Sequence, residues 1–249
     1  MIILRLAYTI YATLVGFPIF AMFNLTTIPA VLQGTVRGRA YYWPGKLWSR
    51  VLYSALGLRM DIEGAESLKL KRGYIVIANH QSLMDIPLVF NVMPRPFTFM
   101  FKKELLDAPF FGWHLRHVGH YCIDRSHGKS IQEQEAEIHK HLAHGHPVVI
   151  FAEGTRSLDG NLQPFKRGAF QLALKTGAPI IPLYINGTFR FKAKSGRTAW
   201  PTRVHVSIGT AIDVKKMASD DKGLRAASVT LTEQVQAAMQ SLAQAIPKV

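Results

Sequence analysis

The chain has 249 residues, enough for one sizeable domain or for one domain with an appendage. Its hydrophobic content of 48% excludes an intrinsically disordered protein, and its single cysteine, Cys122, excludes an internal disulfide. The net charge of +14 indicates an anionic partner. Because the basic residues are scattered, without a basic run or zinc-finger spacing, we expect anionic lipid rather than nucleic acid.

The N-terminal stretch from Leu6 to Val36 contains no charged residue. A transmembrane helix needs about 20 mostly apolar residues, so this stretch is long enough to span a membrane. Gly16-Phe17-Pro18 and Pro29 interrupt it, and two short helices in a re-entrant or interfacial hairpin fit as well as one kinked span. A cleaved signal peptide is the alternative, but the apolar character continues past its expected end near Ala21.

We therefore predict a membrane-associated helical segment at residues 1–45 and a folded domain at residues 46–249. Basic residues follow the apolar stretch at once, at positions 37, 39, 46 and 50. For a single span, this excess places the folded domain on the cytoplasmic side. Asn24-Leu25-Thr26 and Asn186-Gly187-Thr188 match the N-glycosylation pattern, which has meaning only in an exported protein.

After residue 45 the chain alternates between strand-like and helix-like stretches. Buried strands are expected at residues 74–78, 97–101, 147–151 and 180–185, and a half-exposed strand at residues 204–208. Helical spacing occurs at residues 130–144, 165–175 and 224–246. Strands followed by helices over one core predict an α/β sandwich, with reactive side chains in the loops at strand ends.

The segment Asn79–Asp85 directly follows the first of these strands. It places His80 five residues before Asp85, as a general base with an orienting carboxylate requires. An imidazole can take a proton from an alcohol near neutral pH, and a carboxylate on its other nitrogen fixes the tautomer. The structural alternative is a capping box, in which Ser82 caps a helix that has Asp85 at its third position.

Four blocks in order resemble the glycerolipid acyltransferase superfamily, most closely its lysophosphatidic acid acyltransferases. They are residues 79–85, residues 102–125 from Lys102-Lys103-Glu104-Leu105 to Ile123-Asp124-Arg125, residues 151–168 with Glu153-Gly154-Thr155-Arg156, and residues 178–182. Ala152 stands where the family usually carries proline, which changes loop stiffness and no reactive group. The resemblance covers about residues 74 to 187 and implies an α/β fold with a mixed sheet flanked by helices.

The resemblance also implies the reaction, in which an acyl thioester is transferred to the free hydroxyl of a lysophospholipid. His80 would act as the general base and Asp85 would orient it. No acyl-enzyme and no tightly bound cofactor are needed, because the thioester is already activated. No Cys or carboxylate block accompanies the histidines at positions 114, 117 and 120, so no metal is expected. The chain has no G-x-S-x-G motif, which argues against a serine esterase.

In the family, the third block binds glycerol phosphate, which assigns substrate binding to Glu153, Gly154, Thr155 and Arg156. A guanidinium suits phosphate oxygens, Gly154 lets the backbone approach, and Thr155 offers a hydroxyl and an amide. The alternative is a surface turn in which Glu153 and Arg156 pair. Lys102, Lys103 and Arg125 are further phosphate candidates; the alternatives are solvated lysines, and an Arg125 paired with an acidic neighbour such as Asp124.

The sequence thus predicts an O-acyltransferase that esterifies the sn-2 hydroxyl of 1-acyl-glycerol-3-phosphate to give phosphatidic acid. The expected partners are membrane lipid, a lysophospholipid acceptor, and acyl-CoA or acyl carrier protein as the donor. The same chemistry on glycerol-3-phosphate or another lysophospholipid is one alternative. A non-catalytic peripheral membrane protein and a hydrolase in which His80 activates water are the others.

Overall fold

The computed structural model describes residues 1–32, 39–107, 112, 115, 117, 120–123, 128–215, 217 and 221–246. Within this part of the chain, seven strands form one sheet in the order β1-β7-β6-β2-β5-β3-β4. The strands are β1 (Arg59–Glu63), β2 (Ile75–Ala78), β3 (Thr98–Lys102), β4 (Tyr121–Ile123), β5 (Val148–Phe151), β6 (Ile180–Asn186) and β7 (Arg203–Ile208). Neighbouring strands are parallel except for β6 and β7, so the expected mixed sheet is confirmed.

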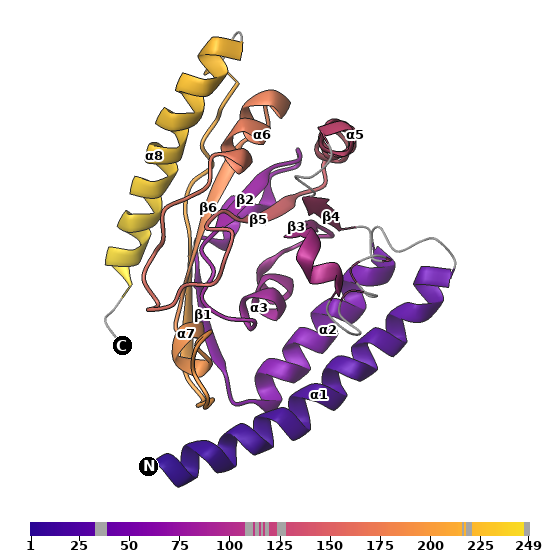
Figure 1. Ribbon diagram of the computed structural model, residues 1–249, viewed down its shortest axis with the longest axis vertical. Helices are drawn as coiled ribbons and strands as arrows, with labels where there is room; N and C mark the ends of the chain where they lie inside the picture. Colours follow the sequence, from indigo (N-terminus) through magenta and orange to yellow (C-terminus); the bar gives the residue numbers. More distant parts are fainter. Residues whose placement is uncertain are drawn as a thin grey trace.

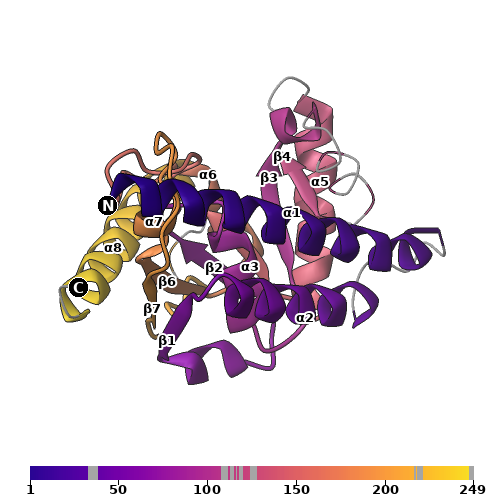
Figure 2. The ribbon, with the colours of Figure 1, turned by 90° about the horizontal axis from the view of Figure 1, so that it is seen from below.

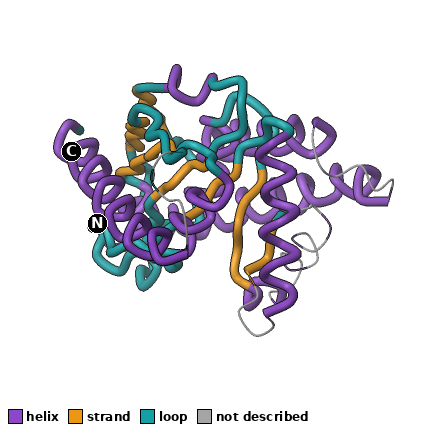
Figure 3. Tube along the Cα trace, turned by 90° about the horizontal axis from the view of Figure 1, so that it is seen from above, coloured by secondary structure: helices purple, strands orange, loops and turns teal. Residues whose placement is uncertain are grey.

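Helices cover both faces of this sheet (Figure 1). They are α1 (Ile2–Leu32), α2 (Arg39–Ala55), α3 (Asp85–Val92), α5 (Gly128–Ala143), α6 (Gly168–Thr176), α7 (Thr188–Phe191) and α8 (Asp221–Ala245), with the 3-10 helices η1 (Ala65–Lys69) and η2 (Lys103–Asp107). The tube view shows the strands enclosed between helices (Figure 3).

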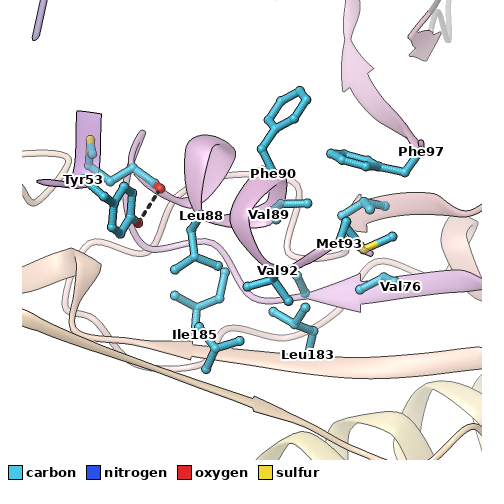
Figure 4. Packing of buried hydrophobic residues seen from close by; sticks show 14 of the residues in the cluster. Tyr53, Val76, Leu88, Val89, Phe90, Val92, Met93, Phe97, Leu183 and Ile185 are labelled. Atoms are coloured by element: carbon cyan, nitrogen blue, oxygen red, sulfur yellow. Dashed lines mark hydrogen bonds between the residues drawn. The ribbon is translucent and has the colours of Figure 1, made fainter. Parts of the chain in front are cut away.

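Strand β2 lies near the centre of the sheet and contributes to a core on each face. Because successive side chains of a strand point to opposite faces, Val76 and Ala78 join the core under α2 and α3, while Ile75 and Ile77 join the core under α6 and α8. Figure 4 shows Leu88 and Val92 of α3 on the side of the helix that faces Leu183 and Ile185 of β6. The central strands are therefore buried on both faces, which explains their continuous apolar sequences.

The five expected strands form within one residue of their predicted ends. The strand at β7 is more buried than the half-exposed strand that we expected, because it pairs with β1 on one side and β6 on the other. The short strands β1 and β4 were not expected. The three expected helices correspond to α5, α6 and α8, and α6 begins at Gly168, three residues later than predicted.

The N-terminal stretch forms one helix, α1, which continues through Gly16 and Pro18. The pair of short helices offered as one alternative for this stretch is therefore wrong. Helix α2 supports the region of the break, since a side chain on Gly16 would contact Leu52 and the rings of Phe20 and Trp48 lie 6.1 Å apart. Proline removes one hydrogen bond of the helix, and this packing compensates for it.

Helices α1 and α2 run side by side in opposite directions (Figure 2). Tyr8 near the start of α1 donates a hydrogen bond to the carbonyl of Leu56, just after α2, and Phe23 stacks on Trp48 at 4.7 Å. Residues 2–29 are long and apolar enough to cross a membrane, and most of their side chains point away from the protein. The predicted boundary at residues 45 and 46 falls within α2, and the division into two domains stays a prediction.

Candidate active site

The two main sequence blocks meet where neighbouring parallel strands end. Strand β2 ends at Ala78 and leads to His80, while its neighbour β5 ends at Phe151 and leads to Glu153. Because the carboxyl ends of parallel strands lie at the same edge of a sheet, these loops lie together. The backbone N–H of Ser157 donates to the carbonyl of His80 at 2.7 Å, which fixes one loop on the other.

His80 and Asp85 form the pair that the sequence predicts. The Nδ1 of His80 lies 2.7 Å from Oδ2 of Asp85, and the Asp85 side chain is fully buried. The same carboxylate oxygen accepts the backbone N–H groups of Gln81 at 2.6 Å and Ser82 at 2.8 Å. A carboxylate surrounded by donors accepts the proton on Nδ1, which leaves Nε2 as the basic ring atom.

The capping alternative is partly present in the same residues. Helix α3 begins at Asp85 itself, so Asp85 occupies the first helical position and not the third. Its carboxylate still accepts the N–H of Ser82, as the acidic residue of a capping box would, and the backbone N–H of Asp85 donates to the Ser82 carbonyl at 3.2 Å. Asp85 therefore has two roles: it is the first residue of helix α3, and its carboxylate forms a hydrogen bond with the imidazole of His80.

The imidazole of His80 lies flat against the ring of Phe151, with centroids 4.2 Å apart and planes inclined by 18°. Its side chain is 15% exposed. The exposed part lines a cavity of about 1090 Å³, which is also bounded by Arg156 and by Phe151 itself. The ring is thus held from its face by Phe151 and at Nδ1 by Asp85, with access to the cavity.

Glu153 does not contact Arg156 in the way that the surface-turn alternative requires. One of its carboxylate oxygens accepts the backbone N–H of His80 at 3.3 Å, and the other accepts that of Gln163 at 3.1 Å. Its side chain is buried, and this burial raises its pKa from 4.5 to about 7, although the two backbone hydrogen bonds oppose the rise. Glu153 therefore connects the loops that follow β2 and β5.

Arg156 lines the cavity and has no acidic partner within the described residues. The neighbouring Thr155 is exposed, and its hydroxyl accepts a hydrogen bond from Nζ of Lys194 at 3.0 Å. Gly154 has a φ of +70°, a conformation that favours glycine, and a side chain there would contact Lys166 at 2.9 Å. The loop thus presents one guanidinium to the cavity with two lysines beside it.

Of the other residues predicted to bind phosphate, only the side chain of Lys103 lies within the described part of the chain. Lys103 begins η2, is exposed and lines the cavity. Lys102 ends β3, and its side chain lies outside the described part of the chain, as does the whole of Arg125. Lys103 and Arg156 therefore line the same cavity, and the roles of Lys102, Lys103 and Arg125 stay predictions.

The walls of the cavity are of two kinds. Aromatic and aliphatic side chains from α1, α2, α3 and the sheet form one part, including Phe20, Phe23, Trp48, Phe90 and Ile150. The charged side chains of the lining are the cations Lys103, Arg156, Lys166 and Lys194 and the carboxylates Glu104, Asp107 and Glu135, of which Glu135 pairs with Lys175. Sequence reasoning assigned no role to Lys166 and missed Lys194. Lys166 stood inside a recognised block and could have been found, whereas nothing in the local sequence singles out Lys194.

Residues 59–186 match the model of a protein family described as Acyltransferase. The chain is 31% identical to the 1-acyl-sn-glycerol-3-phosphate acyltransferase of Cocos nucifera over 82% of its length, and 32% identical to the alpha form from Mus musculus over 74%. A Saccharomyces cerevisiae enzyme of the same name is 35% identical over 60%. The chain spans 65%, 64% and 50% of these relatives, respectively.

A solved structure resembles the whole chain. It is the crystal structure of the 1-acyl-sn-glycerophosphate (LPA) acyltransferase, PlsC, from Thermotoga maritima, with a TM-score of 0.73 and 25% sequence identity. The similarity covers 98% of this chain and 100% of that one, so it includes the N-terminal helices as well as the sheet.

Proposed function

Because the chain belongs to the Acyltransferase family, we propose that it transfers a fatty acyl group to the sn-2 hydroxyl of 1-acyl-glycerol-3-phosphate, giving phosphatidic acid. The names of its relatives support this acceptor. The observation that carries the proposal is the His80–Asp85 pair on a cavity that combines apolar walls with Arg156 and Lys103.

In the proposed reaction, Nε2 of His80 is the general base. This atom takes the proton of the acceptor hydroxyl while the oxygen attacks the thioester carbonyl. The tetrahedral intermediate then collapses, the carbon–sulfur bond breaks, and the imidazolium returns its proton to the leaving thiolate. Asp85 stabilises the imidazolium between the two steps and keeps the ring in the required tautomer. A positioned base of this kind typically contributes about 10²–10⁴-fold to the rate.

The cationic side chains that line the cavity, Arg156 above all, support a phosphate-bearing acceptor. A guanidinium can bind two phosphate oxygens at once, and Arg156 has no carboxylate partner in the described residues to compete with a phosphate. Lys103 adds a second charge on the same cavity. Glu153 acts through the backbone of His80 and Gln163 and not by touching the substrate.

The apolar part supports an acyl chain that enters from a membrane. Phe20 and Phe23 of α1 line the cavity, and other residues of the same helix expose large apolar side chains, such as Leu14 and Phe17. We infer that α1 lies in the bilayer, that the protein contacts membrane lipid, and that the catalytic domain is on the cytoplasmic face, in accord with the basic residues that follow α1.

The donor is an acyl thioester, either acyl-CoA or acyl carrier protein, both of which are anionic and suit the net charge of +14. The proposed reaction uses this donor as a co-substrate and draws on no tightly bound cofactor or metal. The thioester supplies the activated carbonyl, and the residues of the chain supply the base and the binding groups.

The test compares two acceptors that differ in the phosphate. In detergent micelles with palmitoyl-CoA, wild-type protein should prefer 1-acyl-glycerol-3-phosphate to 1-acylglycerol, and Arg156→Ala should abolish most of this preference by raising the acceptor KM. Arg156→Lys, which keeps the charge but loses the fork of donors, should fall between the two. Equal use of both acceptors by the wild type would contradict the phosphate site.

The remaining outcomes identify the alternatives. Preference for glycerol-3-phosphate would indicate the same acyl-transfer chemistry on a different acceptor. Thiol release without any acceptor would indicate a hydrolase. Absence of turnover with acyl-CoA and with acyl carrier protein, on every acceptor, would indicate a non-catalytic membrane protein.

A further inference from the structure

A third side chain completes the His80–Asp85 pair. We propose that Thr188 is a positioning residue that holds the Asp85 carboxylate, and through it the imidazole of His80, in the orientation needed for proton transfer. This inference rests on the proposed function for its catalytic consequence. Its structural part, the state of the His80 ring, is independent of the substrate.

The two oxygens of Asp85 have different partners. Oδ2 accepts Nδ1 of His80 and the backbone N–H groups of Gln81 and Ser82. Oδ1 accepts the hydroxyl of Thr188 at 2.6 Å, and both side chains are fully buried. Hydrogen bonds to an ionised group are short and strong, and a buried carboxylate oxygen left without a donor is costly. The Thr188 hydroxyl therefore fixes the side of the carboxylate that faces away from His80.

The position of Thr188 follows from the sheet. Thr188 begins α7, with only Gly187 between it and the end of β6, the other neighbour of β2, so its side chain reaches the same edge of the sheet as His80. The side chain of Asn79 donates to the carbonyl of Ile185 at 2.9 Å and accepts its N–H at 2.7 Å, which fastens the end of β6 to the loop after β2.

The turn that delivers Thr188 requires a glycine. Gly187 has a φ of +105°, and a side chain on it would lie 2.3 Å from the carbonyl oxygen of Arg203. Gln81 supports the next residue: its amide nitrogen donates to the carbonyl of Gly160 at 2.8 Å, so its oxygen faces the backbone N–H of Phe189 at 3.4 Å. The same oxygen of Gln81 lies 3.4 Å from the Thr188 hydroxyl, so the 2.6 Å hydrogen bond to Asp85 is the shorter of the two that this hydroxyl can donate.

The sequence Asn186-Gly187-Thr188 matches the N-glycosylation pattern, but in the structure Gly187 and Thr188 have structural roles. Gly187 makes the turn, and the hydroxyl of Thr188 points inward to Asp85 with no exposed surface. The motif is therefore part of the edge of the sheet that carries the candidate base, and its threonine belongs to the hydrogen-bond chain Thr188–Asp85–His80.

The kinetic test uses substitutions that keep the shape of the side chain. Thr188→Val removes the hydroxyl and should lower kcat by about 10- to 100-fold with little change in either KM, as expected for one hydrogen bond to a charged group. Valine places a methyl group where threonine has its hydroxyl, and this methyl could disturb the fold. Thr188→Ala removes the hydroxyl without adding a methyl group and should lower kcat to the same extent as Thr188→Val. Thr188→Ser restores the hydroxyl and should recover most of the lost kcat. Thr230→Val, on the exposed side of α8, is the matched control without effect.

A double-mutant cycle separates positioning from general stability. If Thr188 acts through Asp85, Thr188→Val should cause almost no further loss in an Asp85→Asn background. An equal loss of kcat in both backgrounds would overturn the proposal, as would an unchanged kcat in Thr188→Val, or a loss confined to KM.

A spectroscopic test does not require catalytic turnover of a substrate. In ¹⁵N-histidine-labelled protein, with His80 assigned by its loss in His80→Gln, the wild type and Thr188→Ser should show the Nδ1–H tautomer. Thr188→Val and Thr188→Ala should show a mixture of tautomers. A retained Nδ1–H tautomer in both would overturn the inference. Correct tautomer shifts without turnover of the wild type would contradict the proposed function and leave the positioning role standing.

Discussion

Replacement of Glu153 by glutamine tests whether Glu153 is a buried carboxyl group that binds its proton more tightly in the folded protein than in the unfolded chain. Burial raises its pKa from 4.5 to about 7, so the folded protein binds a proton here more tightly than the unfolded chain. At about 1.36 kcal/mol per pKa unit, this difference corresponds to roughly 3 kcal/mol. Because the folded pKa is the higher one, this stability is present below pH 4.5 and is lost as the pH rises to about 7.

Glutamine cannot be ionised but has nearly the same size and shape as the glutamate side chain. Its single oxygen can accept the N–H of His80 or of Gln163 but not both, which costs about 1–3 kcal/mol at every pH. Glu153→Gln should therefore be less stable than the wild type at pH 5, and equal to it or more stable at pH 8. The difference in unfolding free energy between the two should change by about 3 kcal/mol over this range.

Urea unfolding in detergent micelles, followed by tryptophan fluorescence from pH 4.5 to 8, measures this difference. Glu66→Gln, at an exposed position of η1, is the control and should follow the wild type throughout. A difference between wild type and Glu153→Gln that stays constant within about 1 kcal/mol over the whole range would refute the assignment of a buried, proton-binding Glu153.

Two further predictions concern Asp85 and α1. Asp85→Asn should lower kcat by about 10²–10⁴-fold, since an amide no longer selects the Nδ1–H tautomer of His80; steady-state thiol release measures it, and a loss below threefold would contradict the role of Asp85. Leu14→Glu, at a side chain of α1 that is 68% exposed, should shift the protein from the membrane pellet to the supernatant without lowering its melting temperature in detergent. Unchanged sedimentation of Leu14→Glu at high salt would contradict insertion of this face of α1.

Much of the fold could be predicted from local sequence. The central strands are buried on both faces, so they read as short apolar runs with clear ends, and the five expected strands were found. Strand β1 was missed because Arg59-Met60-Asp61-Ile62-Glu63 has charged residues on an edge strand, which carries no buried run. For the N-terminal stretch the sequence left one kinked helix and two short helices equally open, and the structure decides for one helix that continues through Pro18 and packs against α2.

The site was predictable where its residues are close in sequence. His80 and Asp85 are five residues apart, and the family resemblance marked the block at Glu153. The role of Glu153 as an acceptor of backbone N–H groups depends on how β2 and β5 pair, which no short motif records. Thr188 follows a predicted strand, but its contact with Asp85 spans 103 residues and depends on the order of the strands.

Acyl transfer by His80→Ala, measured beside the wild type, decides whether His80 is the general base. Palmitoyl-CoA and 1-acyl-glycerol-3-phosphate in detergent micelles would be followed by free thiol and by phosphatidic acid, with His139→Ala, on the exposed face of α5, as the control. We expect His80→Ala to lose about 10²–10⁴-fold in kcat and His139→Ala to match the wild type. Phosphatidic acid formed by His80→Ala at the wild-type rate would contradict the central claim that His80 is the general base.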